Sequence, residues 1–371
     1  MLTSNLDQRI IHDKGVLVTF GCDPEMFIAR DGEIVESADA IGGLGNSFWT
    51  DSGNSKIVQD GVQVELNPSP SSCRASVINS TAQLINTLAK TVKKKGMEIS
   101  FQPVVKLDPE ALAKMSEAAK RLGCLPSFNA YDAKAEVKVG KDFATRSAGG
   151  HIHIGYKPGK TDADYNRFAN ILDIIVGNTC VMIDRDPSAA ERRKTYGRAG
   201  EYRKPLYGFE YRTLSNFWLR SSQLMSMVMG LCRLAVLIHN KSQRKHLRGN
   251  NWDPAAELLA SVDMNQVTRA INENDLELAK LNWAPVRAFI DAHVEVMEAG
   301  LDTEKLDNFD YFLSEIESKG LERWFPLEPL QHWSTVAEGH GIGWEAWIDQ
   351  CVEQVKSENN VSRILEKIRG A

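Results

Sequence analysis

Several features that would assign a function at once are missing from this chain of 371 residues. Its six cysteines are scattered and form no Cys-x-x-Cys pair, so the sequence indicates neither a zinc ribbon nor a thiol redox motif. Residues 1–13 are polar and lack the apolar stretch of a secretion signal. We therefore expect a reduced, cytoplasmic protein.

Strong net charge and long apolar runs are also missing. The formal net charge of -5 gives no general attraction to nucleic acids or acidic membranes, so we expect neither as a partner. The most apolar run, residues 224–238, is interrupted by Arg233 and is short for a bilayer span, so it predicts a buried helix. The glycine-rich segment 42–45 lacks the Lys-Ser/Thr of a phosphate-binding loop and predicts a mobile loop instead.

The order of the expected elements predicts an α+β fold. Up to about residue 220, strands do not alternate regularly with helices, which favours a largely antiparallel sheet with flanking helices over a Rossmann or barrel plan. Beyond that point, nearly every segment has helical periodicity. We therefore predict a catalytic domain over residues 1–220 and a helical C-terminal subdomain, packed on it, over residues 221–371. The expected strands are 16–20, 26–29, 34–36, 61–66, 98–105, 151–155 and 207–214, and the expected helices are 76–95, 108–122, 162–183, 223–241, 254–262, 267–271, 283–298, 310–319 and 344–353.

Four short segments place reactive side chains two residues apart. Three of them are bordered by β-branched or aromatic residues, which predicts strands, and residues i and i+2 of a strand share one side of the sheet. If these strands lie side by side, carboxylates, imidazoles and a guanidinium converge on one polar face. The segments are Asp23-Pro24-Glu25, Gln63-Val64-Glu65-Leu66-Asn67, His151-Ile152-His153 and Glu210-Tyr211-Arg212.

These side chains are suited to hold a divalent cation. Carboxylates are costly to bury without a cation or another partner, and oxygen-rich sites with one or two histidines favour Mg²⁺ or Mn²⁺ over Zn²⁺. His151 and His153 follow two glycines that let a ligand approach the backbone, which suits metal or phosphate binding. Each pair taken alone also fits a solvated sheet face or a structural histidine. The repeated spacing favours a site built from Asp23, Glu25, Glu65 and Glu210 together with the histidines.

Positive charge is concentrated in residues 192–204, just before the segment that contains Glu210. Arginine side chains match phosphate oxygens in bidentate geometry, so Arg192, Arg198 and Arg203 are candidates for nucleotide or substrate binding. A solvated basic loop or an RNA contact would explain the same residues. Only the nearby acidic strand favours nucleotide phosphates.

Taken together, the motifs resemble those of the phage-type carboxylate–amine ligases (COOH-NH2 ligases, type 2), a group in the glutamine synthetase and glutamate–cysteine ligase superfamily. The resemblance covers about residues 16–220 and implies a glutamine-synthetase-like catalytic sheet. The matching stretches, in the order of the family, are Asp-Pro-Glu after a glycine, Val-Glu-Leu-Asn-Pro, Gly-Gly-His-Ile-His-Ile-Gly and Tyr-Gly-Phe-Glu-Tyr-Arg.

The resemblance also implies roles for single residues. Glu25 is similar to the first-strand glutamate that binds metal, with Asp23 in place of the glutamate often found two residues earlier. Glu65 is similar to the metal glutamate of the central strand, where glutamine synthetase has a second one nearby. His151 resembles the metal-binding histidine, and His153 resembles the neighbour that faces the substrate.

The final motif and the basic loop complete this set. Glu210 and Arg212 resemble the Glu-x-Arg pair in which the glutamate holds metal and the arginine contacts the phosphate of the reacting intermediate. Arg192 and Arg198 lie where the superfamily places nucleotide-binding arginines, and Arg203 lies where it places a substrate-binding one. The implied catalytic residues are Glu65, Glu210 and Arg212, and the implied metal ligands are Asp23, Glu25, Glu65, His151 and Glu210.

The activity that the resemblance implies is ATP-dependent amide-bond formation between a small-molecule or peptide carboxylate and an amine, through an acyl phosphate. It requires ATP and Mg²⁺ (or Mn²⁺), and it allows a homo-oligomer. Two other functions stay open. One is a zinc-type hydrolase that uses the two histidines and a carboxylate, although the strand–helix alternation of a His-x-His barrel is missing. The other is a non-catalytic protein that holds a nucleotide or RNA.

Overall fold

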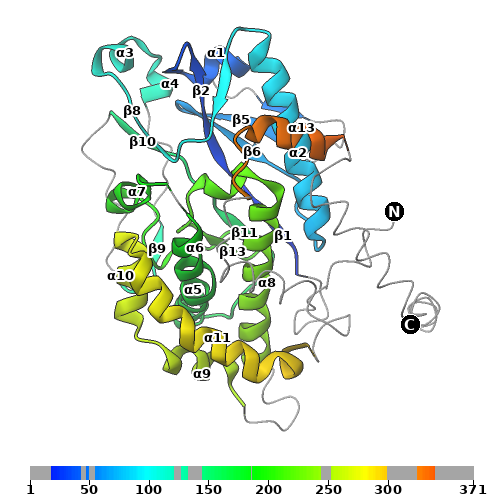
Figure 1. Cartoon of the computed structure of the whole chain (residues 1–371), viewed down its shortest axis with the longest axis vertical. Coiled ribbons are helices and arrows are strands. Elements are labelled where there is room, and N and C mark those ends of the chain that lie inside the picture. Colours follow the sequence, from blue (N-terminus) through cyan, green and yellow to red (C-terminus); the bar gives the residue numbers. More distant parts are fainter. Residues whose placement is uncertain are drawn as a thin grey trace, which may run out of the picture.

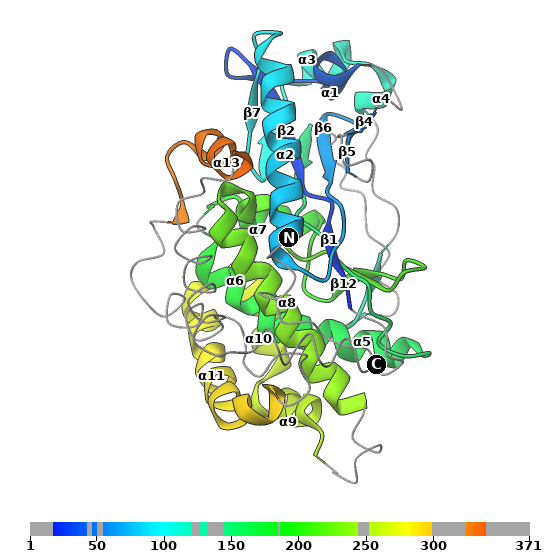
Figure 2. The ribbon, with the colours of Figure 1, turned by 90° about the vertical axis from the view of Figure 1, so that its right-hand side faces the viewer.

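The computed structural model describes residues 18–42, 47–49, 55–120, 127–132, 144–184, 186–243, 252–298 and 324–338. Every strand pair in these residues is antiparallel, and helices flank the sheets, which confirms the α+β prediction. Figures 1 and 2 show one sheet near the middle of the molecule and a second sheet beside α2 (Arg74–Lys93) at one end. A group of helices fills the other end.

The first sheet carries two of the four motifs. Ile152, Ile154, Phe209 and Tyr211 are buried on its back face, as predicted. Their neighbours at alternate positions point to the opposite face because side chains alternate along a strand. The strands lie in the order β1 (Phe20–Cys22), β11 (Ile152–Ile154), β13 (Phe209–Tyr211), β12 (Glu201–Arg203) and β9 (Phe128–Asn129).

The second sheet begins with a hairpin of β2 (Glu25–Arg30) and β3 (Glu33–Val35). Asp31 and Gly32 form its turn with φ angles of 53° and 81°, the left-handed conformation that a tight two-residue turn requires. The strands lie in the order β3, β2, β6 (Gln63–Asn67), β5 (Lys56–Asp60) and β4 (Ser47–Trp49), and β7 (Glu98–Ser100) also pairs with β2.

The two sheets are joined directly by Asp23 and Pro24, which connect β1 to β2. The Glu25 N–H donates to the Gly149 carbonyl (2.8 Å), and the Leu66 N–H donates to the Pro24 carbonyl (3.0 Å), so both sheets hold the link. The sequence suggested one continuous polar face over four adjacent strands. That expectation was wrong: the face is divided between two sheets, since Pro24 has no N–H with which to continue a ladder.

Two other predicted elements are also divided. The expected strand 98–105 separates at Pro103 into β7 and β8 (Val104–Lys106), and β8 pairs with β10 (Thr145–Ser147). The expected helix 108–122 starts as predicted, because the Asp108 carboxylate accepts the N–H of Ala111 (2.9 Å). It ends early, and the chain forms α3 (Pro109–Lys114) and α4 (Glu117–Lys120) instead.

A long helical stretch covers the back of the first sheet, as expected for residues 162–183. It consists of α5 (Asp162–Leu172), a π-helical segment η2 (Asp173–Gly177) and α6 (Asn178–Ile183). The ring of Phe168 on α5 packs edge-on against Phe209 of β13, with centroids 4.9 Å apart. This contact fixes the back of the sheet whose other face carries the polar side chains.

The apolar run near residue 230 forms α8 (Ser222–Gln243), the buried helix that was predicted. Among the described helices, only α8 is long and apolar enough to cross a membrane, and 89% of its most apolar window is buried inside the molecule. This burial is typical of a core helix. Other short elements near the sheets are α1 (Ser37–Ile41), α7 (Ala189–Thr195) and the 3-10 segment η3 (Asn216–Arg220).

The regular elements among the described residues beyond 221 are helices, as predicted. They include α9 (Pro254–Ser261), α10 (Met264–Glu273), α11 (Leu276–Glu298) and α13 (Pro329–Ala337). The first three pack around α5, α6 and α8, whereas α13 packs on α2 of the other end (Figure 1). The expected helices 310–319 and 344–353, and residues 43–45 of the glycine-rich segment, lie outside the described residues.

Candidate metal and phosphate site

A row of polar side chains crosses the front of the first sheet. Strand pairing places His153 of β11 opposite Glu210 of β13, and it places Glu210 opposite Arg203 of β12. These three side chains belong to the face away from the buried Ile152 and Tyr211. An imidazole, a carboxylate and a guanidinium therefore stand next to one another.

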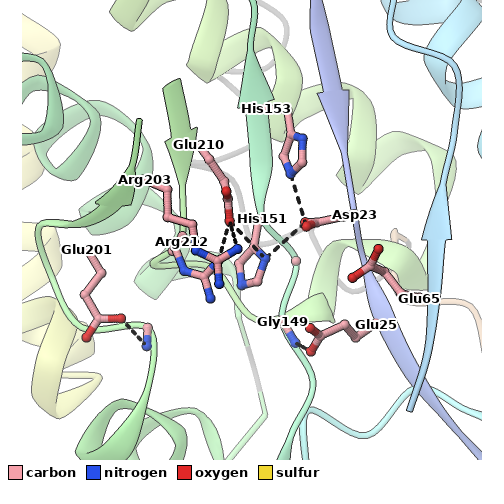
Figure 3. Close-up of polar contacts among 12 residues, drawn as sticks. Asp23, Glu25, Glu65, Gly149, His151, His153, Glu201, Arg203, Glu210 and Arg212 are labelled. Carbon is pink, nitrogen blue, oxygen red and sulfur yellow. Dashed lines mark hydrogen bonds and ion pairs between the residues drawn. The ribbon is translucent and has the colours of Figure 1, made fainter. Parts of the chain in front are cut away.

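Asp23 joins this row from the link between the two sheets. Its Oδ1 lies 3.0 Å from His151 Nδ1, and its Oδ2 lies 3.1 Å from His153 Nε2. Burial acts to raise the pKa of Asp23, but the two imidazoles outweigh burial and hold this pKa well below its usual range. Asp23 is therefore ionised at neutral pH, with both histidines gathered around it (Figure 3).

The two histidines respond differently to this setting. His151 is 2% exposed, and burial, together with the charge of Arg212, lowers its pKa to about 4. Burial also acts to lower the pKa of His153, but the charge of Asp23 outweighs it and raises this pKa. His151 is thus neutral near pH 7, which is the form that offers a lone pair to a cation.

Arginines hold Glu210 in place. Arg212 Nη1 donates a hydrogen bond to Glu210 Oε1, and Arg203 Nη1 lies 3.3 Å from the same oxygen. Arg212 Nη2 also donates to the hydroxyl of Tyr196 (2.5 Å). Burial acts to lower the pKa of Arg212, but Tyr196 and Glu210 raise it. Two guanidiniums next to carboxylates form a place where a phosphate group would find strong cationic donors.

A group of three carboxylates lies on the second sheet, on the other side of Asp23 (Figure 3). Pairing of β2 with β6 sets Glu25 opposite Glu65. A two-residue turn beginning at Gly61 joins β5 to β6 and brings Asp60 to the same face as Glu65. We call Glu25, Asp60 and Glu65 the carboxylate group.

Neutral amides hold two of these carboxylates. Glu25 Oε2 accepts hydrogen bonds from the Gly149 N–H (2.7 Å) and from Gln63 Nε2 (2.8 Å). Glu65 Oε1 accepts one from Asn67 Nδ2 (2.6 Å). Gln63 and Asn67 occupy alternate positions of β6 with Glu65, so one strand face supplies the Glu65 carboxylate, its amide donor Asn67 and the amide donor to Glu25.

Packing these carboxylates together makes their ionisation costly. Burial raises the pKa of Glu65 to about 7, and the charge of Asp23 adds to the rise. Burial and the neighbouring carboxylates also raise the pKa of Glu25 and of Asp60. A bound cation would favour the ionised forms, so this group has the electrostatics of a metal site.

The donor set on the first sheet also fits a divalent cation. Asp23, His153 and Glu210, which we call the histidine group, offer ligand atoms within 4.8 Å of one another, as does the carboxylate group. Nδ1 of His151 lies 3.0 Å from Asp23 and 3.8 Å from Glu210. Asp23 Oδ1, His151 Nδ1 and His153 Nε2 are buried, and none makes an aligned hydrogen bond to the described residues. Carboxylate oxygens that converge with the neutral His151 ring in this way suit Mg²⁺ or Mn²⁺.

The structure brings together most of the residues that the sequence singled out. Arg192 and Arg198 are placed differently: the guanidinium of Arg192 is 1% exposed and donates to the Thr213 carbonyl (2.9 Å). Arg198 donates to the carbonyls of Arg193 and Lys194. Their nucleotide-binding role stays a prediction. The residues that do converge are Asp23, Glu25, Glu65, His151, His153, Arg203, Glu210 and Arg212.

Sequence reasoning missed three residues of the site: Asp60, Tyr196 and Tyr207. For Asp60 a signal was present. Ile57 and Val58 are β-branched and Gly61 follows Asp60, so a strand with a two-residue turn into the next strand would have predicted Asp60 on the Glu65 face. The two tyrosines carry no comparable pattern, because their hydroxyls reach the histidines only through the tertiary fold.

The comparisons with known proteins agree with the resemblance noted above. The family described as phage phiEco32-like COOH.NH2 ligase-type 2 matches residues 127–299, which confirms the resemblance over that segment. The match includes both histidines and the Glu210–Arg212 pair, and it continues past the predicted domain boundary at residue 220 into the helical region. The boundary itself stays a prediction.

One solved structure to which the chain shows a likeness is entitled "GmaS/ADP complex-Conformation 1". It is 13% identical in sequence, and the similarity covers 73% of this chain and 70% of that one, with a TM-score of 0.32. No curated protein matches the sequence.

Proposed function

From the family match over residues 127–299, we propose that the protein is an ATP-dependent carboxylate–amine ligase that forms an amide bond through an acyl phosphate. We propose further that the protein binds two divalent cations, Mg²⁺ or Mn²⁺, and that its substrates are small molecules or peptides. A cytoplasmic location and a homo-oligomer are also part of the proposal.

The observation that carries the proposal is the pair of ligand groups at the link between the sheets. The histidine group contains Asp23 and the carboxylate group contains Glu25, and only Pro24 separates these two residues in the chain. Cations in two adjacent sites neutralise the charge of a nucleoside triphosphate and of the phosphoryl group in transfer. The first cation would be held by Asp23, Glu210 and a histidine, and the second by the carboxylate group.

Arginine side chains of the protein would stabilise the negative charge that the cations leave unbalanced. In the proposed reaction a carboxylate oxygen attacks the γ-phosphorus and ADP leaves; the amine then attacks the acyl carbon, loses a proton and displaces phosphate. Arg212 and Arg203 lie beside Glu210, where their N–H groups would stabilise negative charge that grows on the phosphoryl oxygens. His153, whose side chain is 24% exposed, is the histidine that a substrate reaches more easily.

The test is product analysis with ATP, Mg²⁺ and pooled amino acids, amines and peptides. We expect ADP and phosphate to appear together with a condensed product detected by mass spectrometry, and Mg-ATP to raise the melting temperature. Glu65→Gln is the matched control, because it keeps the shape of the side chain. A protein whose melting is unchanged by millimolar Mg-ATP, and that releases no ADP across the panel, would overturn the proposal.

A further inference from the structure

Each histidine of the His-x-His motif is in contact with a tyrosine hydroxyl. Tyr196 Oη lies 2.5 Å from Nε2 of His151, and Tyr207 Oη lies 2.7 Å from Nδ1 of His153. The two rings consequently turn different nitrogens toward Asp23: His151 presents Nδ1 and His153 presents Nε2. The tyrosines thus occupy the ring nitrogens that a cation would not use.

The two tyrosines differ in their surroundings. Tyr207 is 49% exposed in the turn between β12 and β13, and its ring stacks on His153 with centroids 5.7 Å apart. Tyr196 is 7% exposed and serves a second partner, because Arg212 donates to the same hydroxyl. Its ring also lies 4.9 Å from the guanidinium carbon of Arg192 and 5.1 Å from that of Arg212.

The protonation of the His151 ring follows from these contacts. Nδ1 and the facing Asp23 oxygen are 3.0 Å apart, and neither makes an aligned hydrogen bond to the described residues, so a cation between them would be held by the carboxylate and by the lone pair of Nδ1. The ring proton then sits on Nε2 and is donated to Tyr196. A phenol oxygen has two lone pairs, and here they would receive His151 and Arg212.

We propose that Tyr196 is a positioning residue of the site: it keeps the proton of His151 on Nε2, so that Nδ1 faces the cation, and the same oxygen orients Arg212 toward phosphate. The inference rests on the proposed function. It implies that one hydroxyl links metal affinity to the orientation of the phosphate-binding arginine. Hydrogen bonds to the second nitrogen of a metal-binding histidine generally tune metal affinity in this way.

Tyr196→Phe tests the proposal, because it leaves the ring between the two arginines and removes only the oxygen. Mn²⁺ affinity is measured by electron paramagnetic resonance without nucleotide, and we expect the Kd to rise about 10-fold. The matched control is Tyr211→Phe. It removes another buried phenol, which donates to Asp173 (2.7 Å) on the back of the same sheet, and it should leave the Mn²⁺ Kd unchanged.

A second measurement does not depend on a variant that folds. Nitrogen NMR of the histidine rings in the wild type with bound Mg²⁺ reports which nitrogen of His151 carries the proton, and we expect Nε2.

A third measurement uses a double variant. In the background of His151→Ala, removal of the Tyr196 oxygen should add no further loss of Mn²⁺ affinity, because the two residues act through one interaction.

Three results would overturn the proposal while leaving the ligase function intact, provided that the wild type still releases ADP. They are an unchanged Mn²⁺ Kd in Tyr196→Phe, an equal loss in Tyr211→Phe, and a proton on Nδ1 of His151. A wild-type protein that binds no Mn²⁺ would instead overturn the metal site on which both proposals rest.

Discussion

The histidine group and the carboxylate group offer a comparison within one site. Around the histidine group the protein supplies its own positive charge, from the His153 ring and from the arginines on Glu210, and the pKa of Asp23 is held low. In the carboxylate group, Glu25 and Glu65 receive hydrogen bonds from neutral amides, and the pKa of Glu65 rises to about 7. The first group is electrostatically balanced as it stands, whereas the second is balanced only when a cation is present.

We therefore expect metal binding at the carboxylate group to have the larger effect on the stability of the folded chain. A cation at the carboxylate group would remove repulsion that the fold itself does not relieve, so it should add stability as well as activity. A cation at the histidine group would replace contacts that the protein already makes.

The largest effect should follow from Glu65→Gln. The substitution keeps the shape of the side chain and removes one charge from the carboxylate group, so ADP release at saturating Mg²⁺ should fall by on the order of 100-fold or more. Circular dichroism should show an intact fold. Activity near that of the wild type would remove Glu65 from the site.

The next effect separates the two histidines. His151→Ala should weaken Mn²⁺ binding by at least ~10-fold and slow acyl-phosphate formation. His153→Ala should leave the Mn²⁺ titration close to normal and chiefly raise the KM for the carboxylate substrate, as expected when uniform binding is lost. Two folded variants with wild-type titrations would argue that neither ring is a ligand. The reverse pattern would exchange their roles.

In the absence of metal, the two groups should respond to charge removal with opposite signs. Asp23→Asn takes away the anion between two imidazoles, and it should lower the free energy of unfolding by about 1–3 kcal/mol. Glu65→Gln relieves repulsion among carboxylates and should raise that free energy. Urea unfolding in a chelator measures both. If both variants are destabilised, the carboxylate group is not strained by its charge.

The smallest effect concerns pH. The pKa of Glu65 is about 7 in the fold, above the ordinary value near 4.5, so between these values the folded state binds more protons than the unfolded one. Stability without metal should therefore fall as pH rises through that window. Asp173, whose pKa burial also raises to about 7, contributes the same sign and remains in the variant.

The difference between wild type and Glu65→Gln isolates the contribution of Glu65. We expect a steeper loss of stability in the wild type between about pH 5 and pH 7, by on the order of 1 kcal/mol. Saturating Mg²⁺ should make the stability of the wild type less dependent on pH in this range. Parallel curves for the two proteins would show that Glu65 is not the source.

Local patterns were enough to predict part of the strands and to single out most of the polar side chains that converge. The i and i+2 spacing correctly placed His153 and Glu210 on one face and their buried neighbours on the other, because the period of a strand is a local property. The division into two sheets was not predictable in this way. It depends on a missing donor at Pro24 and on contacts with distant segments, such as the Gly149 carbonyl that accepts the Glu25 N–H.

Other residues of the site become apparent only when distant segments meet. Tyr196 follows α7 in a basic stretch, and nothing in the sequence around it distinguishes a hydroxyl that bridges His151 and Arg212 from a surface tyrosine. Arg192 shows the opposite case. Its charge suggested a ligand, yet its described hydrogen bonds go to main-chain carbonyls, because the fold places the residue in the interior.

The direct link between the sheets also sets an order of events during synthesis of the chain. The Glu25 carbonyl accepts a hydrogen bond from the side-chain amide of Asn216 (2.9 Å), which lies 191 positions later in the sequence. The surroundings of the carboxylates that are translated first are thus complete only after η3, which follows the last strand of the first sheet, has been synthesised. Closing a loop of this length costs conformational entropy before the contact stabilises the fold, which slows folding. Uptake of Mn²⁺ by a refolding chain would accordingly report when the two sheets have come together.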